Sequence, residues 1–286
     1  MTALVTPLRG GQIDEEALRR LISWQIESGI DALVPCGTTG ESVALSAEEQ
    51  KRVIRITVEE TRGRVPVIAG AGANSTEHAI ALSKTAKEAG ADGLLQVTPY
   101  YNRPPQEGLF QHFRAIVNEV RLPTVVYNVP ARTGCDLQVD TVARLCELEG
   151  IVGIKEASGT VQRTQAILAR VGDRLTVFSG EDAINFPLYA VGAKGCISVV
   201  SNIAPKLIAD CWDRAFAGDM AGARKLHAES LPLADALFME PSPIPTKTAL
   251  SLMGKMTAEL RLPMVPMSDK GCEHLTSVLK KSGLLS

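Results

Sequence analysis

The sequence is poor in the residues that most often hold metal ions or form disulfides. It has only four histidines and six cysteines in 286 residues, and these form no H-x-x-x-H or C-x-x-C pair. A structural zinc site and a disulfide framework are therefore not expected. Lysine and arginine do not outnumber the acidic residues, and the formal net charge is −2. The basic surface that nucleic-acid binding requires is not expected either.

Long apolar runs are also missing. No run approaches the roughly 18 residues that a membrane span needs, and the first residues lack the basic and apolar regions of a signal peptide. We therefore expect a cytoplasmic protein with no membrane partner. The hydrophobic content of 45% is nevertheless ample for a packed core in a chain of this length.

Short apolar runs rich in Val, Ile and Leu recur at intervals of 20 to 34 residues. They are residues 3–7, 31–37, 65–72, 93–99, 123–130, 151–158, 175–181 and 195–202. Such runs are typical of buried parallel strands. The segments between them have helical periodicity, and Ser46 with Glu49 predicts a capping box at the start of one helix. Eight strand-and-helix units predict a (β/α)8 TIM barrel over residues 1–218. A doubly wound open sheet is the alternative, which the even spacing disfavours.

The remaining residues, 219–286, predict a C-terminal helical region. Helices are expected over residues 219–238, 245–254 and 268–282, separated by two proline-rich segments. This region would pack on the barrel or form a contact between subunits.

Reactive residues gather where the predicted strands end, which is where this fold carries its catalytic groups. Three of the four tyrosines (Tyr100, Tyr101 and Tyr127) lie at strand ends. Lys155, the one lysine of twelve within an apolar strand, lies in the sixth run, at the expected end of its strand. Burial disfavours the charged ammonium and so favours the nucleophilic amine, which forms a Schiff base with a keto acid. The alternative for Lys155 is a structural ion pair with a carboxylate such as Glu156, although adjacent strand residues point to opposite faces.

Other strand-end residues suit proton transfer and carboxylate binding. Tyr127 would carry protons next to the imine, or else it is a core aromatic residue. Thr38 and Thr39, in a glycine-bracketed turn, offer hydroxyl and backbone donors to a carboxylate, or else serve the turn alone. Arg132 is suited to bind a carboxylate through two guanidinium nitrogens, or else it is a surface arginine.

Four motifs together identify a resemblance. They are Gly-Thr-Thr-Gly-Glu-Ser at 37–42, Tyr-Tyr-Asn at 100–102, Tyr-Asn-Val-Pro-Ala-Arg-Thr-Gly at 127–134 and Gly-Ile-Lys-Glu at 153–156. In this order they resemble the dihydrodipicolinate synthase family of the pyruvate-dependent class I aldolases, from the first strand to the C-terminal helices. The resemblance implies a lyase of lysine and diaminopimelate biosynthesis. It would condense pyruvate with L-aspartate 4-semialdehyde to 4-hydroxy-tetrahydrodipicolinate.

Carried over by position, the resemblance also implies the site. Lys155 would form the imine, and Tyr127, Thr39 and Tyr101 would form a proton relay, with Tyr101 crossing the tight-dimer interface of a homotetramer. The substrates would be bound by Thr38, Thr39, Arg132, Gly180 and Ile197. No metal or organic cofactor is implied, because the lysine supplies the electron sink.

A departure from the family concerns feedback by lysine. The resemblance places Ala47 and Gln50 where strongly inhibited bacterial members have histidine, and His78 where they have glutamate. Without that glutamate the ammonium group of lysine lacks an acceptor, so we expect weak or absent inhibition.

Two rival functions remain. A sugar-acid or N-acetylneuraminate-type pyruvate aldolase would use the same lysine and tyrosine, but would not place an arginine at position 132. A catalytically silent barrel that binds a small acid is the other rival, and the filled reactive positions disfavour it.

Overall fold

The computed structural model describes residues 1–285, in two compact units. One unit is Ile68–Ile197, and the other joins Met1–Val67 to the chain from Ser198 onward. The two units are described in turn below.

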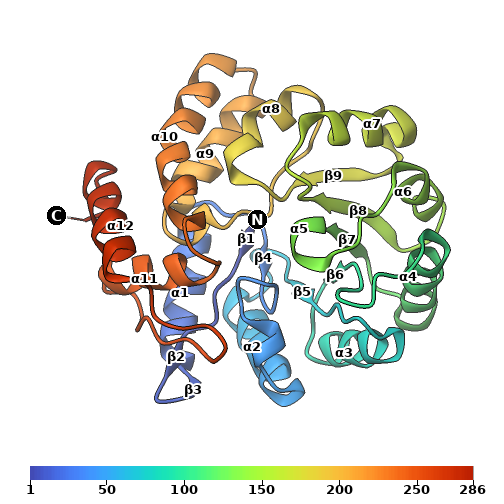
Figure 1. Cartoon of the computed structure of the whole chain (residues 1–286), viewed down its shortest axis with the longest axis horizontal. Coiled ribbons are helices and arrows are strands. Elements are labelled where there is room, and N and C mark those ends of the chain that lie inside the picture. Colours follow the sequence, from blue (N-terminus) through green and yellow to red (C-terminus); the bar gives the residue numbers. More distant parts are fainter. Residues whose placement is uncertain (286) are drawn as a thin grey trace. The chain divides into compact units, whose positions relative to one another are not determined.

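The unit Ile68–Ile197 is built on a five-stranded parallel sheet with its strands in sequence order. The strands are β5 (Ile68–Gly70), β6 (Gly93–Val97), β7 (Thr124–Asn128), β8 (Ile151–Glu156) and β9 (Thr176–Ser179). A parallel bridge from Ser179 to Cys196 adds the next strand segment beside β9. The helices are α3 (Thr76–Glu88), α4 (Gln106–Val120), α5 (Pro130–Thr133), α6 (Val139–Leu145), α7 (Val161–Val171) and α8 (Asn185–Ala190). Figure 1 shows α3, α4, α6 and α7 along the outer side of this sheet.

Burial explains why these runs are strands. Every residue of β7 is buried, as in a parallel sheet covered on both faces. Gly153 in β8 shows how closely the strands pack. A Cβ atom there would lie 2.9 Å from the carbonyl oxygen of Thr176 and 3.0 Å from the Phe178 ring, so any other residue would push β8 away from β9.

The second unit combines both ends of the chain. Its strand β1 (Thr2–Ala3) pairs in parallel with β4 (Leu33–Val34), and bridges join Thr2 to Ser198 and Leu33 to Val67. Its helices are α1 (Glu15–Glu27), α2 (Ala47–Thr61), α9 (Pro205–Phe216), α10 (Met220–Phe238), α11 (Ile244–Leu252) and α12 (Asp269–Lys281). The hairpin of β2 (Leu8–Arg9) and β3 (Gln12–Ile13) precedes α1.

Capping residues set where several helices begin. Ser46 accepts a hydrogen bond from the Glu49 N–H, and the Glu49 carboxylate accepts one from the Ser46 N–H, which confirms the predicted capping box. The Asp14 carboxylate likewise accepts from the Ala17 N–H at the start of α1.

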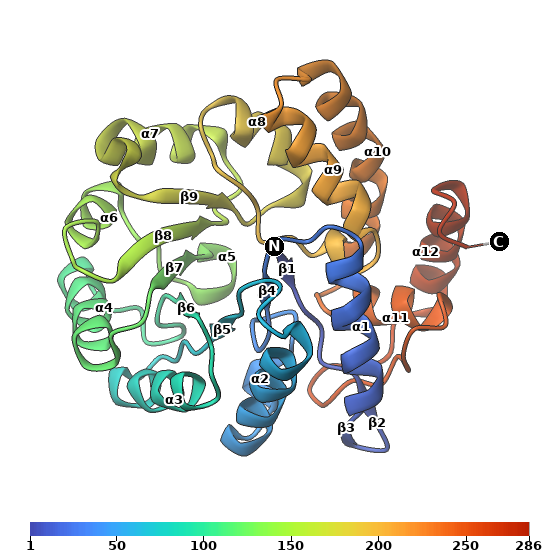
Figure 2. The same ribbon diagram turned by 180° about the vertical axis from the view of Figure 1, so that it is seen from behind.

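The C-terminal region consists of the three predicted helices, α10, α11 and α12, each within two residues of its expected ends. Helix α10 lies alongside α9 in both views (Figure 1 and Figure 2). The boundary at residue 218 stays a prediction. The sequence did not predict the β2–β3 hairpin or helix α5, which are only two residues per strand and four residues long.

Two features are absent from the part of the chain that the structure describes. No helix there combines the length and apolar character of a membrane span. No three acidic, histidine or cysteine side chains within residues 1–285 are placed to hold a metal ion together.

Candidate active site

Lys155 and Tyr127 are direct neighbours in the sheet of the unit Ile68–Ile197. They are register partners on β8 and β7, and the Lys155 Nζ lies 4.4 Å from the centre of the Tyr127 ring. Lys155 is 5% exposed and Tyr127 is 7% exposed. The sheet therefore holds an amine and a phenol together, largely shielded from water, as a cation–π pair.

The carboxylate that follows Lys155 faces other partners. Glu156 accepts hydrogen bonds from the Ser158 N–H (2.7 Å) and from Asn128 Nδ2 (3.1 Å). Burial raises the pKa of Glu156, and the bonds from Ser158 and Asn128 oppose that rise. Within residues 1–285 no carboxylate lies at ion-pair distance from the Lys155 amine. The geometry therefore disfavours the structural ion pair that the sequence left open for Lys155.

Gly180, just after β9, leaves room for the lysine side chain. A Cβ atom on Gly180 would lie 3.0 Å from Lys155 Cε and 2.6 Å from Ala157 Cβ. A larger residue would therefore clash with Ala157 and crowd the Lys155 side chain. Ile197, 1% exposed, donates its N–H to the Ser179 carbonyl next to Gly180, at 2.9 Å. The structure thus brings both predicted residues to the strand end beside β8.

Sequence reasoning missed Glu181, which follows Gly180. Burial raises the pKa of its half-buried carboxylate, whereas the positive charges of Lys155 and Arg132 lower it. Lys155, Arg132 and Glu181 therefore share one electrostatic environment. The position of Glu181 at a predicted strand end was a usable signal.

Arg132 is exposed on the four-residue helix α5. Hydrogen bonds with Asn128 hold the end of the loop that follows this helix. Asn128 accepts from the Leu137 N–H at 3.0 Å and donates to Asp136 at 3.0 Å, and Asp136 also pairs with Arg163. Asn128 is fully buried. It therefore joins the end of β7 to the end of the Arg132 loop, a role that the sequence did not reveal.

Tyr101 has an unusual backbone and surface position. Its φ is +75°, a conformation that non-glycine residues rarely adopt, and its N–H donates to the Thr133 carbonyl at 3.1 Å. Its side chain is 90% exposed. A strained residue that presents an aromatic ring to solvent is typical of a functional contact rather than of a core position.

Thr38 and Thr39 lie in a tight turn of the other unit. The Gly37 carbonyl accepts from the Gly40 N–H, and the Thr38 carbonyl from the Glu41 N–H, both at 3.1 Å. Thr39 is buried and Thr38 is exposed. Thr6 Oγ1 donates to the Gly40 carbonyl at 2.8 Å and holds the turn from the end of the first strand run.

Comparisons with known proteins place the chain in a family. Residues 1–282 match the model of the Dihydrodipicolinate synthetase family. The 4-hydroxy-tetrahydrodipicolinate synthases of Geobacter sulfurreducens and Oleidesulfovibrio alaskensis are 53% and 54% identical to this chain, and each alignment covers 100% of the chain and 98% of the relative.

A solved structure agrees. The crystal structure of the chloride-inhibited dihydrodipicolinate synthase from Acinetobacter baumannii complexed with pyruvate has a TM-score of 0.98 and 45% identity, over 99% of this chain and 98% of that one. The fold is therefore the α/β TIM barrel with a C-terminal helical region, and the protein is a lyase. The chain belongs to the Dihydrodipicolinate synthetase family, whose enzymes act in lysine and diaminopimelate biosynthesis.

Proposed function

We propose that the protein condenses pyruvate with L-aspartate 4-semialdehyde to 4-hydroxy-tetrahydrodipicolinate through a Schiff base on Lys155. The observation that carries this proposal is the buried Lys155 amine, 4.4 Å from the centre of the Tyr127 ring and with no carboxylate of the described residues at ion-pair distance. A lysine amine that no carboxylate holds in an ion pair can attack the carbonyl carbon of a keto acid.

The proposed chemistry proceeds in four steps. The Lys155 amine attacks C2 of pyruvate, and the carbinolamine loses water to give an imine. Loss of a methyl proton then gives an enamine, whose carbon attacks the aldehyde carbon of the semialdehyde to form the new carbon–carbon bond. Finally, the amino group of the bound semialdehyde attacks the imine carbon, which closes the ring and releases Lys155 as a free amine.

The other residues have roles in this proposal. Tyr127, Thr39 and Tyr101 relay protons to and from the intermediates. Thr38 and Thr39 donate to the pyruvate carboxylate, as the turn that exposes Thr38 supports. Arg132 binds the semialdehyde carboxylate. Its exposed position on α5 leaves its guanidinium accessible to the second substrate. Gly180 and Ile197 line the site beside the Lys155 stem.

Tyr101 links catalysis to assembly. We propose that it completes the relay of a second subunit in a tight dimer, within a homotetramer. Its exposed ring and left-handed backbone support a contact with another chain. A cytoplasmic location stays a prediction as well.

Reduction with sodium borohydride in the presence of pyruvate tests the function. Trapping adds the reduced three-carbon acid to one lysine, and peptide mass mapping is expected to find it on Lys155. Absence of any adduct would favour the silent-barrel alternative. A parallel assay with N-acetylneuraminate separates the synthase from the sugar-acid aldolase, for which Arg132 gives no support.

Arg132→Ala is expected to impair the second substrate selectively. The loss of charge-assisted hydrogen bonds should raise the KM for the semialdehyde by about 10- to 100-fold, whereas pyruvate trapping on Lys155 should keep its wild-type rate. Steady-state kinetics and the trapping rate measure the two effects. Equal losses in both would show that Arg132 is structural.

Feedback by lysine is expected to be weak or absent. Gln50 is buried, and its amide nitrogen donates to the Ser42 carbonyl at 2.9 Å, so that this amide is already engaged. Ala47 and His78 are exposed and supply no carboxylate for an ammonium group. Isothermal titration calorimetry should detect no micromolar binding of L-lysine, and tight binding would refute this prediction.

A further inference from the structure

A second buried lysine lies outside the residues assigned to catalysis. Lys247 on α11 is 0% exposed, and its Nζ donates to Glu41 Oε1 at 2.6 Å. The Glu41 side chain is 3% exposed, so both charged groups of the pair are shielded from water. Burial lowers the pKa of Lys247, and the negative charge of Glu41 opposes this. The pair therefore keeps two charges in the interior, where an apolar pair would be as stable or more stable.

Glu41 is part of the turn that carries Thr38 and Thr39. Its N–H closes the turn on the Thr38 carbonyl at 3.1 Å, and its own φ is +55°. The left-handed conformation is unfavourable for a residue with a Cβ atom. Glu41 persists in it only because contacts outside the turn fix it.

Those contacts come from the C-terminal region. The second oxygen of Glu41 accepts from the Arg261 N–H at 3.1 Å. The Arg261 guanidinium binds both oxygens of Glu49, at 2.5 and 2.7 Å, and donates to the Ala44 carbonyl at 3.0 Å. Each oxygen of Glu41 thus has one donor. Ala44, before the start of α2, and Glu49, in its first turn, both bind Arg261.

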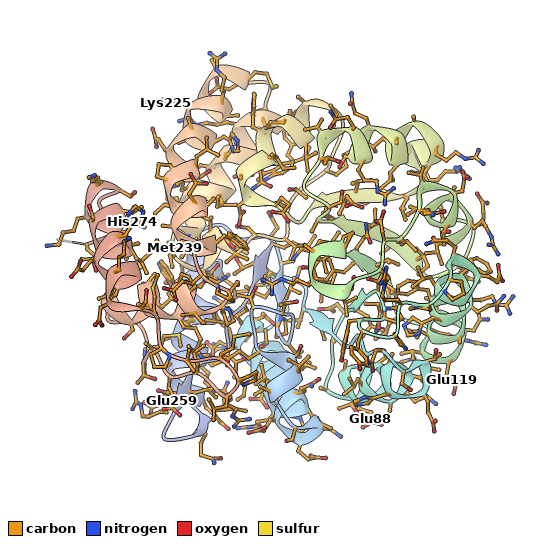
Figure 3. All side chains as sticks on the ribbon, viewed as in Figure 1. Glu88, Glu119, Lys225, Met239, Glu259 and His274 are labelled. Atoms are coloured by element: carbon orange, nitrogen blue, oxygen red, sulfur yellow. The ribbon has the colours of Figure 1, made fainter. Side chains whose placement is uncertain are left out.

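The same segment also holds the first hairpin. The Glu259 carboxylate accepts from the Gly10 and Gly11 N–H groups at 2.7 and 2.5 Å, and Figure 3 shows Glu259 near this hairpin. Residues 259–261 therefore bind the β2–β3 hairpin, which precedes the strand run at 31–37, and also the segment 41–44, which follows it. They reach Glu41 as one connected set of hydrogen bonds.

We propose that Lys247 and Arg261 are positioning residues that orient the Thr38–Thr39 turn for the carboxylate of pyruvate. Lys247 acts on Glu41 through its ammonium group, and Arg261 acts on Glu41 through its backbone N–H. The Arg261 guanidinium acts on Glu49 and Ala44. This inference rests on the proposed function, because it assumes that the turn receives that carboxylate. Two directional bonds fix the orientation of the Glu41 carboxylate, which packing alone would leave free to rotate. The C-terminal helical region thereby sets the affinity for the first substrate.

The double variant Glu41→Gln/Lys247→Met separates positioning from stability. It removes both buried charges at near-constant volume and keeps an oxygen for the Arg261 N–H. Borohydride trapping is titrated with pyruvate and, in parallel, with hydroxyacetone, a ketone without a carboxylate. The concentration for half-maximal trapping should rise about tenfold for pyruvate, as expected for one weakened hydrogen bond to a charged group. It should stay unchanged for hydroxyacetone.

A matched control uses an ion pair of the same unit that is partly exposed. Arg52 binds Glu15 at 2.6 Å between α2 and α1, with side chains 42% and 41% exposed. Glu15→Gln/Arg52→Met should leave both titrations at wild-type values. Arg261→Met keeps the buried pair and the backbone N–H bond to Glu41 but removes the guanidinium bonds to Glu49 and to the Ala44 carbonyl. It therefore tests the anchoring of the turn by this segment if the double variant does not fold. Its expected increase for pyruvate is about threefold.

The outcomes are distinct. An unchanged pyruvate titration in a folded variant, or equal shifts for pyruvate and hydroxyacetone, would overturn the positioning role. Failure of the wild-type protein to trap pyruvate at any concentration would instead overturn the proposed function itself.

Discussion

Lys155→Met is expected to reduce turnover to background. The variant keeps a side chain of similar length but has no amine to form the imine, so kcat/KM should fall by at least about four orders of magnitude. Borohydride and pyruvate should leave its mass unchanged. A coupled assay and intact-protein mass spectrometry measure the two effects.

The fold of this variant should be preserved. Lys155 makes no ion pair within residues 1–285, and the Glu181 carboxylate that its charge influences is also influenced by the positive charge of Arg132. A methionine in the buried position therefore leaves no carboxylate without a cation nearby. Lys255 provides a matched control, because its Nζ also lies over an aromatic ring, 3.7 Å from the centre of Trp24. Lys255→Met should retain full turnover. An adduct that persists in Lys155→Met would assign the nucleophile to another lysine.

Among the variants proposed, Lys247→Met is expected to cause the largest decrease in the free energy of unfolding. The substitution leaves the Glu41 carboxylate 3% exposed without its ammonium partner, which should cost about 3–5 kcal/mol. For a chain of this size the melting temperature should fall by roughly 10 °C. Thermal unfolding at a fixed scan rate measures this shift.

The double variant Glu41→Gln/Lys247→Met is the diagnostic comparison. Once both charges are gone, no uncompensated ion remains, and most of the lost stability should return. If the single and double variants melt at the same temperature, volume rather than charge explains the loss. Wild-type stability in Lys247→Met would show that water reaches Glu41.

The barrel was predictable because its strands are buried on both faces. A parallel strand such as β7 appears in the sequence as an uninterrupted apolar run, and eight such runs were recognisable. Short elements such as α5 and the β2–β3 hairpin have too few residues to show a period. Their positions depend on turn geometry and on contacts made elsewhere in the chain.

The same logic explains which parts of the site were predictable. Strand ends that follow one another in a parallel sheet lie side by side, so Tyr127 and Lys155 could be expected together. Their approach to 4.4 Å required the structure. The Glu41–Lys247 pair joins residues 206 positions apart, and Lys247 lies in a helix whose sequence does not show that it is fully buried. The hydrogen bonds of Asn128 to Asp136 and Leu137 depend on how the loop after α5 folds back toward β7, which no local sequence pattern specifies.

The hydrogen bonds between β1 and Ser198 bear on the order in which the chain folds during synthesis. Ala3 donates to the Ser198 carbonyl at 2.9 Å, and Ser198 donates to the Met1 carbonyl at 3.0 Å. During translation the first residues therefore cannot form these bonds until some two hundred codons have been read. The unit Ile68–Ile197, in contrast, is continuous in sequence and is synthesised without interruption. A stop codon before Lys247 would deprive Glu41, made long before, of its counter-ion.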